Sequence, residues 1–181
     1  CDVTVSWFAY DPVQYPASMP QVDELVRVIA RAKERFFLNY CTFGYTMPWW
    51  EWEDWERFID WMALNGVTMP LANTGQEAVW QKVWRNHGLT DEQIRTYFTG
   101  PAHLAWHRMN NIDSFDGPLP QGWIDSQVEL QKKILERERS LNMRPVLSAF
   151  NGHVPEQLKE IYPSALITDI KGWGGFEEEY L

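Results

Sequence analysis

The chain has 181 residues, 45% of them hydrophobic, which is enough for one ordinary domain with a real core. Twenty-five Asp and Glu against 16 Lys and Arg give a formal net charge of -9. A chain of this charge repels a phosphate backbone, so we expect no nucleic-acid partner. No apolar run approaches the roughly 20 residues that cross a bilayer, so we expect no membrane span in this segment.

The two ends suggest a piece of a longer protein. The chain starts at Cys1 in a strand-like stretch, residues 3–7, and stops at Leu181 without a closing element. We interpret residues 1–33 as the end of a preceding domain and a linker, because prolines recur at Pro12, Pro16 and Pro20. Residues 25–32 fit helical and strand spacing equally well.

Cys1 and Cys41 match no metal-binding spacing. Two interpretations stay open for them: buried thiols, or a disulfide if the protein is exported.

The pattern becomes regular after residue 34. Residues 36–41 predict a buried strand, and residues 39–50 a polar and aromatic loop. Residues 52–64 predict a helix with acidic residues at its start and a buried face. Gly66 closes that helix. The predicted buried face consists of Trp52, Trp55, Ile59, Met62 and Ala63.

The same alternation continues along the chain. Residues 67–71 predict a second strand and residues 77–86 a helix that ends before Gly88. Thr90 and Gln93 form a capping box for a helix to about residue 98. The later expected elements are helices over 102–108 and 124–141, a strand over 145–150, a helix beginning at Pro155 and a fourth strand over 165–168. The charged helix over 124–141 is typical of a solvated outer helix.

Helices between all the strands predict parallel β/α units. The expected fold class is α/β, a partial (β/α)8 TIM barrel preceded by the tail of a small α/β domain. Four strands make half of an eightfold barrel, so residues 34–181 would be its N-terminal half.

In such a barrel the loops after the strands carry the site. Eleven Trp residues favour a sugar ligand, because an indole offers an apolar face to a pyranose ring. Asn39 and Cys41 alternate along the expected first strand and would share one face; a satisfied core Asn and a buried thiol are the alternative. Tyr45 follows in the loop, where its hydroxyl could bond to a sugar oxygen and its ring could stack on the sugar. Packing within the loop is the alternative.

Trp106 follows a Gly-Pro break and could wall the site, whereas Trp52 and Trp55 follow helical spacing and belong to the core. Glu77 lies at a helix start, where the helix dipole alone would explain it, or where it could bond to sugar hydroxyls. His153 follows the third strand and is either a structural hydrogen-bonder or a substrate contact. His103 and His107 make no metal site on their own.

Several long motifs in order resemble one family. The chain is similar to the α-N-acetylglucosaminidases of glycoside hydrolase family 89 over residues 36–175. The motifs include residues 39–42 (NYCT), 59–66 (IDWMALNG), 75–80 (GQEAVW), 98–102 (FTGPA), 116–120 (DGPLP) and 152–155 (GHVP). Asn151 departs from the family pattern, which frequently has a small residue there.

The resemblance implies a retaining exo-glycosidase that releases terminal α-linked N-acetylglucosamine, with two catalytic Glu residues beyond Leu181 and no cofactor. Its pocket would use Asn39, Tyr45 and Glu77 for hydrogen bonds, Trp106 for apolar contact, and Cys41 and His153 as wall. The substrate would be a glycan, and the parent protein would be secreted, periplasmic or lysosomal.

Two other classes stay open. A non-catalytic carbohydrate-binding domain is usually a β-sandwich, which the helical periodicity disfavours. Another barrel hexosaminidase would place its carboxylates differently beyond Leu181.

Overall fold

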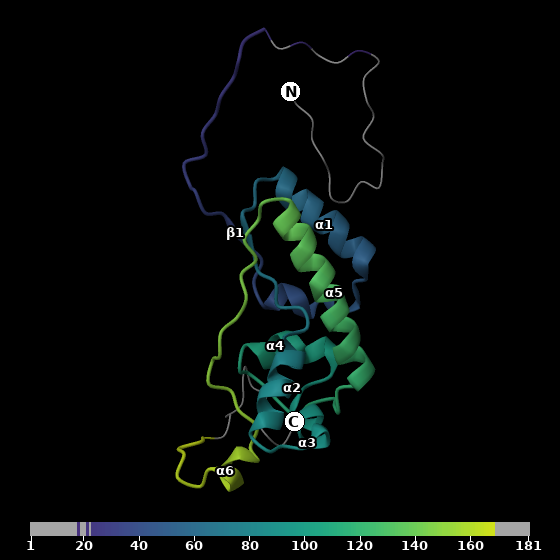
Figure 1. Ribbon diagram of the computed structural model, residues 1–181, viewed down its shortest axis with the longest axis vertical. Coiled ribbons are helices and arrows are strands. Elements are labelled where there is room, and N and C mark those ends of the chain that lie inside the picture. The colour runs from purple at the N-terminus through teal and green to yellow at the C-terminus, as the bar shows by residue number, and fades with distance from the viewer. Residues whose placement is uncertain (1–17, 19–20, 22, 169–181) are drawn as a thin grey trace.

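Three parallel strand segments lie side by side in the fold. The computed structural model describes residues 18, 21 and 23–168 (Figure 1). Strand β1 (Phe36–Phe37) pairs in parallel with β2 (Met69–Pro70), with Phe37 opposite Pro70. A parallel bridge from Leu71 to Val146 adds the third segment. Helices connect consecutive segments, as β/α units require.

Helix α1 (Trp52–Leu64) connects the first two strand segments. The backbone N–H of Glu51 donates to Asp54 at 3.2 Å, which satisfies one free group at the helix start. Gly66 then turns the chain with a φ of 76°, a conformation that glycine adopts without strain. The helix buries Trp55, Phe58, Ile59 and Met62, while Trp52 and Ala63 are half-buried. The predicted helix is confirmed, with a slightly different inner face.

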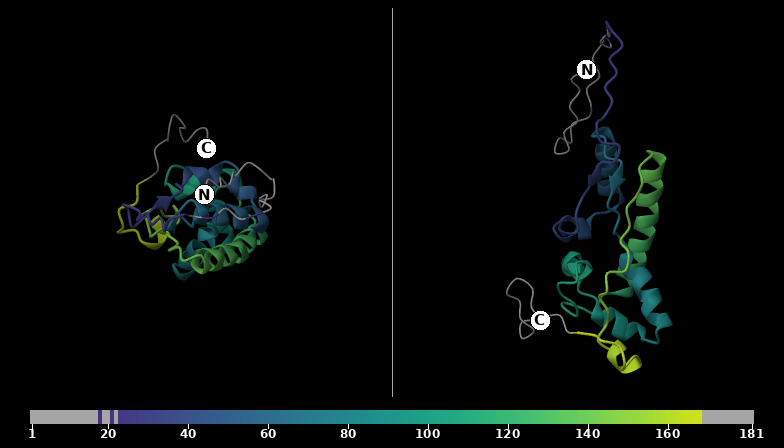
Figure 2. Two further views of the ribbon diagram at one scale, coloured as in Figure 1. Left: turned by 90° about the horizontal axis from the view of Figure 1, so that it is seen from above. Right: turned by 90° about the vertical axis from the view of Figure 1, so that its left-hand side faces the viewer.

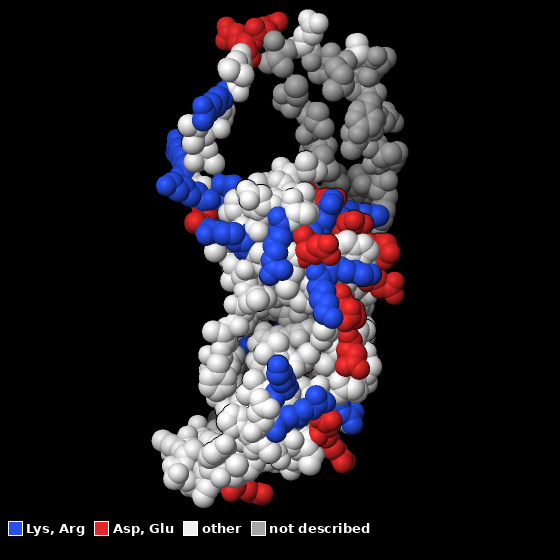
Figure 3. Space-filling model, viewed as in Figure 1, with Lys and Arg blue, Asp and Glu red and all other residues white. Residues whose placement is uncertain are grey.

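The 20-residue helix α5 (Gln121–Ser140) lies beside α1 (Figures 1 and 2). Leu130 and Ile134 of α5 join the core formed by α1. The Arg137 guanidinium ties the two helices by donating to both carboxylate oxygens of Asp60, each at 2.9 Å. Charges of both signs mix on the surface over α1 and α5 (Figure 3). That mixture fits the solvated outer helix predicted from the sequence.

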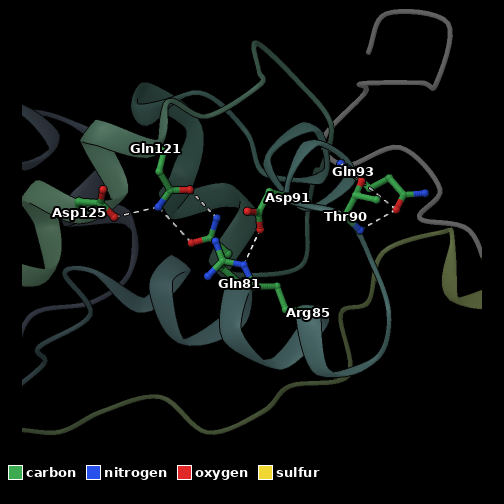
Figure 4. A network of polar contacts seen from close by, with 7 residues as sticks. All are labelled: Gln81, Arg85, Thr90, Asp91, Gln93, Gln121 and Asp125. Carbon is green, nitrogen blue, oxygen red and sulfur yellow. Dashed lines mark hydrogen bonds and ion pairs between the residues drawn. The ribbon is translucent and has the colours of Figure 1, made fainter.

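Helices α2 (Gln76–Asn86) and α3 (Asp91–Tyr97) form the other end of the molecule. Gln81 on α2 exchanges amide hydrogen bonds with Gln121 at the start of α5, and Arg85 pairs with Asp91 at the start of α3 (Figure 4). The predicted capping box is confirmed: Gln93 N–H donates to Thr90 Oγ1 at 3.2 Å, and Thr90 N–H donates to Gln93 Oε1 at 2.8 Å.

The remaining helices are short. They are the 3-10 helices η1 (Cys41–Gly44), η2 (Met47–Trp49) and η3 (Pro101–His103), and the α-helices α4 (Leu104–Arg108) and α6 (Leu158–Ile161). A second apolar cluster around Trp80, Trp84, Phe98 and Leu119 packs α2, α3 and α4 together. No helix among residues 23–168 is long and apolar enough to span a membrane.

The first strand is shorter than predicted. Leu38 has a φ of 77°, which leaves the extended region, and the chain then enters η1. Phe36 and Phe37 are exposed by 55% and 36%, so the expected burial of the whole 36–41 stretch is wrong. The expectation that Asn39 and Cys41 share a strand face is therefore also wrong.

Three later expectations need correction. The 145–150 stretch is reduced to the Val146 bridge, and the helix expected from Pro155 begins at Leu158. Residues 165–168 form no strand, because Ala165 N–H turns back to Tyr162 O and Leu166 is 95% exposed. Residues 25–32, for which helix and strand were both open, adopt neither. The expected strand over residues 3–7 lies outside the described residues.

Candidate functional site

Polar side chains link the ends of the three parallel segments. Ser148 Oγ is 2.6 Å from Tyr40 Oη and donates to Asn73 Oδ1 at 2.8 Å. The register explains this meeting. Tyr40 lies three residues after Phe37, Asn73 three after Pro70, and Ser148 follows Val146 as Asn73 follows Leu71. The carboxyl ends of parallel strands are where α/β barrels place their sites.

Asn73 is the buried member of this link. Its side chain is 2% exposed, and its Nδ2 has no hydrogen-bond partner among the residues that the structure describes. Tyr40, Asn73 and Ser148 were not among the residues predicted from the sequence. Each of the three residues lies the same number of positions after a paired strand residue as its partner does. The sequence alone could not identify them, because it does not show which strand residues pair.

Helix α4 brings two predicted site residues together. The Trp106 ring meets the Tyr45 ring edge to face, with centroids 6.1 Å apart. Gly44 allows this approach, because a Cβ there would overlap the Trp106 ring and lie 2.9 Å from Ala105 Cβ. Tyr45 is 71% exposed, and Trp106 is half-buried. The loop after β1 and helix α4 therefore form one aromatic wall.

Cys41 and Asn39 come just before Tyr45 in the chain. Cys41 Sγ has no disulfide partner among the described residues and is 3.8 Å from Met109 Sδ just after α4; Cys1, its possible partner, lies outside them. Asn39 Oδ1 accepts from Thr42 N–H at 3.0 Å and from Thr42 Oγ1 at 2.9 Å. Asn39 and Thr42 also line an open hollow that is mostly apolar, with Leu38 and Met47 among its other residues.

Glu77 is buried and pairs with Arg108 at the end of α4. Both its carboxylate oxygens accept from Arg108, at 2.7 Å from Nε and 2.8 Å from Nη2, and the two side chains are 0% and 5% exposed. Removing one partner of such a buried pair costs about 3 to 5 kcal/mol. Contact of Glu77 with a sugar stays a prediction. In the structure, Arg108 already binds both carboxylate oxygens. Arg108 was not predicted as a site residue, because its partner lies 31 residues away.

His153 packs against α4 from the third strand's loop. Its Nε2 is 3.1 Å from Asp113 Oδ2, its Nδ1 is 3.2 Å from His107 O, and its ring contacts those of Tyr97 and His107. Burial lowers the pKa of His107 well below its ordinary value, and the charges of His153 and Arg108 add to that effect. His107 is therefore a neutral part of the core at physiological pH.

The predicted site residues thus converge on α4. Cys41, Tyr45, Glu77 and His153 all reach α4 or the residue after it, and Trp106 belongs to it. Asn39 is the exception, because its hydrogen bonds to Thr42 are local to η1. Within residues 23–168 no three His, Cys, Asp or Glu side chains form a group that could hold a metal ion.

Comparisons with known proteins place this geometry in context. Residues 35–181 match the family model described as the alpha-N-acetylglucosaminidase (NAGLU) TIM-barrel domain. Human alpha-N-acetylglucosaminidase is 43% identical over 180 residues, which is 99% of this chain and 24% of the human protein. The chain therefore spans about a quarter of the length of that relative.

Solved structures agree with the sequence match. A family 89 glycoside hydrolase from Clostridium perfringens, in complex with 2-acetamido-1,2-dideoxynojirmycin, superposes with a TM-score of 0.86 and 38% identity. The match covers 92% of this chain and 19% of that one. The same values hold for a variant of the enzyme with two Glu-to-Gln substitutions, in complex with its substrate GlcNAc-alpha-1,4-galactose. The fold of this chain is accordingly part of a TIM barrel.

Proposed function

Because this chain belongs to the α-N-acetylglucosaminidase family of glycoside hydrolases, we propose that it is part of a retaining exo-glycosidase that releases terminal α-linked N-acetylglucosamine from glycans. The supporting observation is the 43% identity to human alpha-N-acetylglucosaminidase over 180 residues, which is 99% of this chain. We use the term parent protein for a longer chain that contains this segment. Its barrel would follow the tail of a small α/β domain in residues 1–33.

In this proposal the described loops hold the sugar. The Asn39 amide nitrogen donates to a sugar oxygen, since its Oδ1 is already engaged by Thr42. Tyr45, with an exposed ring, adds a hydroxyl, and Trp106 offers an apolar face. Cys41 and His153 shape the wall.

The chemistry requires two carboxyl groups about 5 to 5.5 Å apart. One protonates the glycosidic oxygen while the other attacks the anomeric carbon, and water then releases the sugar with its configuration retained. We place both carboxyl groups beyond Leu181. Residues 23–168 would position the sugar for them, and no cofactor enters these steps.

The glycan substrate suggests a parent protein that meets oligosaccharides outside the cytosol, in a secreted, periplasmic or lysosomal setting. Fractionation of cells that express the parent protein would test this placement.

The activity test uses the parent protein and an aryl α-N-acetylglucosaminide. We expect release of the aryl group and, by NMR, α-N-acetylglucosamine as the first product. The isolated 181-residue chain, rigorously purified, should release none. Inactivity of the parent protein, or a β-anomeric first product, would contradict the proposal, and activity of the isolated chain would show that it carries the catalytic carboxylates itself.

A further inference from the structure

We propose that Glu77 and Arg108 act as a positioning pair that holds α4, and with it Trp106, against the sugar site, rather than as direct sugar ligands. The inference rests on the proposed glycosidase function. It assigns a task to two buried charges that the sugar-holding roles above leave unused.

Arg108 is the point where three loops meet. Its guanidinium binds Glu77, which follows the second strand segment. Its backbone O accepts from Asn151 Nδ2 at 3.1 Å, in the loop after the third segment. Its helix carries Trp106, which packs on Gly44 and Tyr45 after the first segment. A displacement of Arg108 would therefore move the aromatic wall relative to all three strand ends.

The Glu77 side of the pair lies on a longer helix that contacts two neighbouring helices. Glu77 is the second residue of α2, which is tied to α5 by the Gln81–Gln121 amide exchange and to α3 by the Arg85–Asp91 ion pair (Figure 4). Helix α4, by contrast, has only five residues, too few to be stable without tertiary contacts. The two hydrogen bonds between Arg108 and Glu77 therefore hold α4 in place against α2.

The geometry also disfavours a direct sugar contact for Glu77. Its carboxylate is 0% exposed, and each oxygen already accepts a guanidinium N–H. A sugar hydroxyl would have to enter a closed site and compete with a charge-assisted bond. Trp106 on α4 is only half-buried and lies beside the exposed Tyr45. A sugar can therefore reach the Trp106 ring more easily than the Glu77 carboxylate.

The test is a double-mutant cycle in the parent protein. Glu77→Gln, Trp106→Ala and the double variant are compared with the wild type for kcat, KM and melting temperature on an aryl α-N-acetylglucosaminide. Glu77→Gln should lower kcat/KM about 10- to 100-fold through misplacement of the wall. In the Trp106→Ala background the same substitution should change kcat/KM by less than about twofold, because the contact it positions is already gone.

Two further variants separate positioning from general destabilisation. Asp60→Asn breaks another bidentate Arg–carboxylate pair, on α1 and α5 and away from α4, and should lower the melting temperature while kcat and KM stay unchanged. Glu77→Asp retains the charge and should recover part of the kcat/KM lost in Glu77→Gln. If Glu77→Gln does not fold, Arg108→Lys replaces it in the cycle with the same expectation.

Additive losses in the cycle would overturn the inference, because Glu77 would then act on the sugar independently of Trp106. Unchanged kinetics for Glu77→Gln would overturn it as well, leaving the pair with a stabilising role alone. A wild-type parent protein without activity would instead contradict the proposed function, so the two failures are distinguishable.

Discussion

The Tyr45 ring meets the Trp106 ring at an interplanar angle of 80°, although 61 positions separate the two residues in the chain. The contact joins the loop after the first strand to helix α4. An aromatic wall of this kind suits a pyranose, which presents C–H groups to ring faces and hydroxyls to polar neighbours.

Substitutions in the aromatic wall should impair turnover without unfolding the parent protein. Tyr45→Phe removes one hydroxyl from an exposed ring, and Trp106→Ala removes the apolar face of a half-buried one. Both variants should keep a cooperative melt within a few degrees of the wild type, and both should lose kcat/KM on an aryl α-N-acetylglucosaminide. Full activity of Trp106→Ala would place the sugar elsewhere.

Trp55 should behave as a core residue. It is 1% exposed and packs against Phe43, Trp50 and Phe58, so Trp55→Ala should cost about 3 to 5 kcal/mol of unfolding free energy in denaturant titrations. Trp49, six positions earlier and 63% exposed, is the matched control. Trp49→Ala should leave the midpoint nearly unchanged. Equal losses for the two variants would refute this division of the tryptophans.

Gly44 should tolerate no side chain. Gly44→Ala places a Cβ into Ala105 and the Trp106 ring, so it should lower kcat/KM and the melting temperature together. Gly122 in α5 has open space where a Cβ would lie, and Gly122→Ala should be neutral or stabilise by up to about 1 kcal/mol. A neutral Gly44→Ala would mean that η1 and α4 are farther apart in the working enzyme.

Glu138 predicts a dependence of stability on pH. It is 1% exposed, neither carboxylate oxygen has a partner among the described residues, and burial raises its pKa from 4.5 to about 8 against the opposing charge of Arg139. Between pH 4.5 and pH 8 the folded state keeps a proton that the unfolded chain releases. Stability should therefore fall as pH rises through that window, by at most about 1.4 kcal/mol per pH unit.

The variant Glu138→Gln should remove this dependence. Its melting temperature should exceed that of the wild type near pH 8 and match it near pH 4.5, as measured by calorimetry on the parent protein. Glu136→Gln, on the same helix, should follow the wild type at both pH values, because the Glu136 side chain is not buried. A flat wild-type profile would show that Glu138 is ionised and paired in the complete fold.

Helical periodicity was the most reliable signal in the sequence. Helix α1 and the Thr90–Gln93 capping box could be predicted because their hydrogen bonds are local and their apolar spacing is regular. Strand lengths could not be predicted, because a strand is defined by hydrogen bonds to a neighbouring strand that lies far away in the sequence. The positive φ of Leu38 ends β1 after two residues, and nothing in the composition of residues 36–41 indicates it.

The site shows the same division. Tyr45 and Trp106 could be selected from loop position and residue type, and the structure brings their rings together. The partner of Glu77 could not be selected, because Arg108 looks like an ordinary basic residue near a helix end until the fold places it 2.7 Å from the carboxylate. Long-range pairing decides which charged residues lie on the surface and which hold the site.

The hydrogen bond between Tyr40 and Ser148 spans 108 positions of the chain. A contact of that separation forms only after most of the described segment has been synthesised, and its loop-closure entropy must be met before it contributes stability. We therefore expect the polar link at the strand ends to form late in folding. Helix α1 depends on a distant segment in the same way, because its inner face packs against Leu130 and Ile134 of α5.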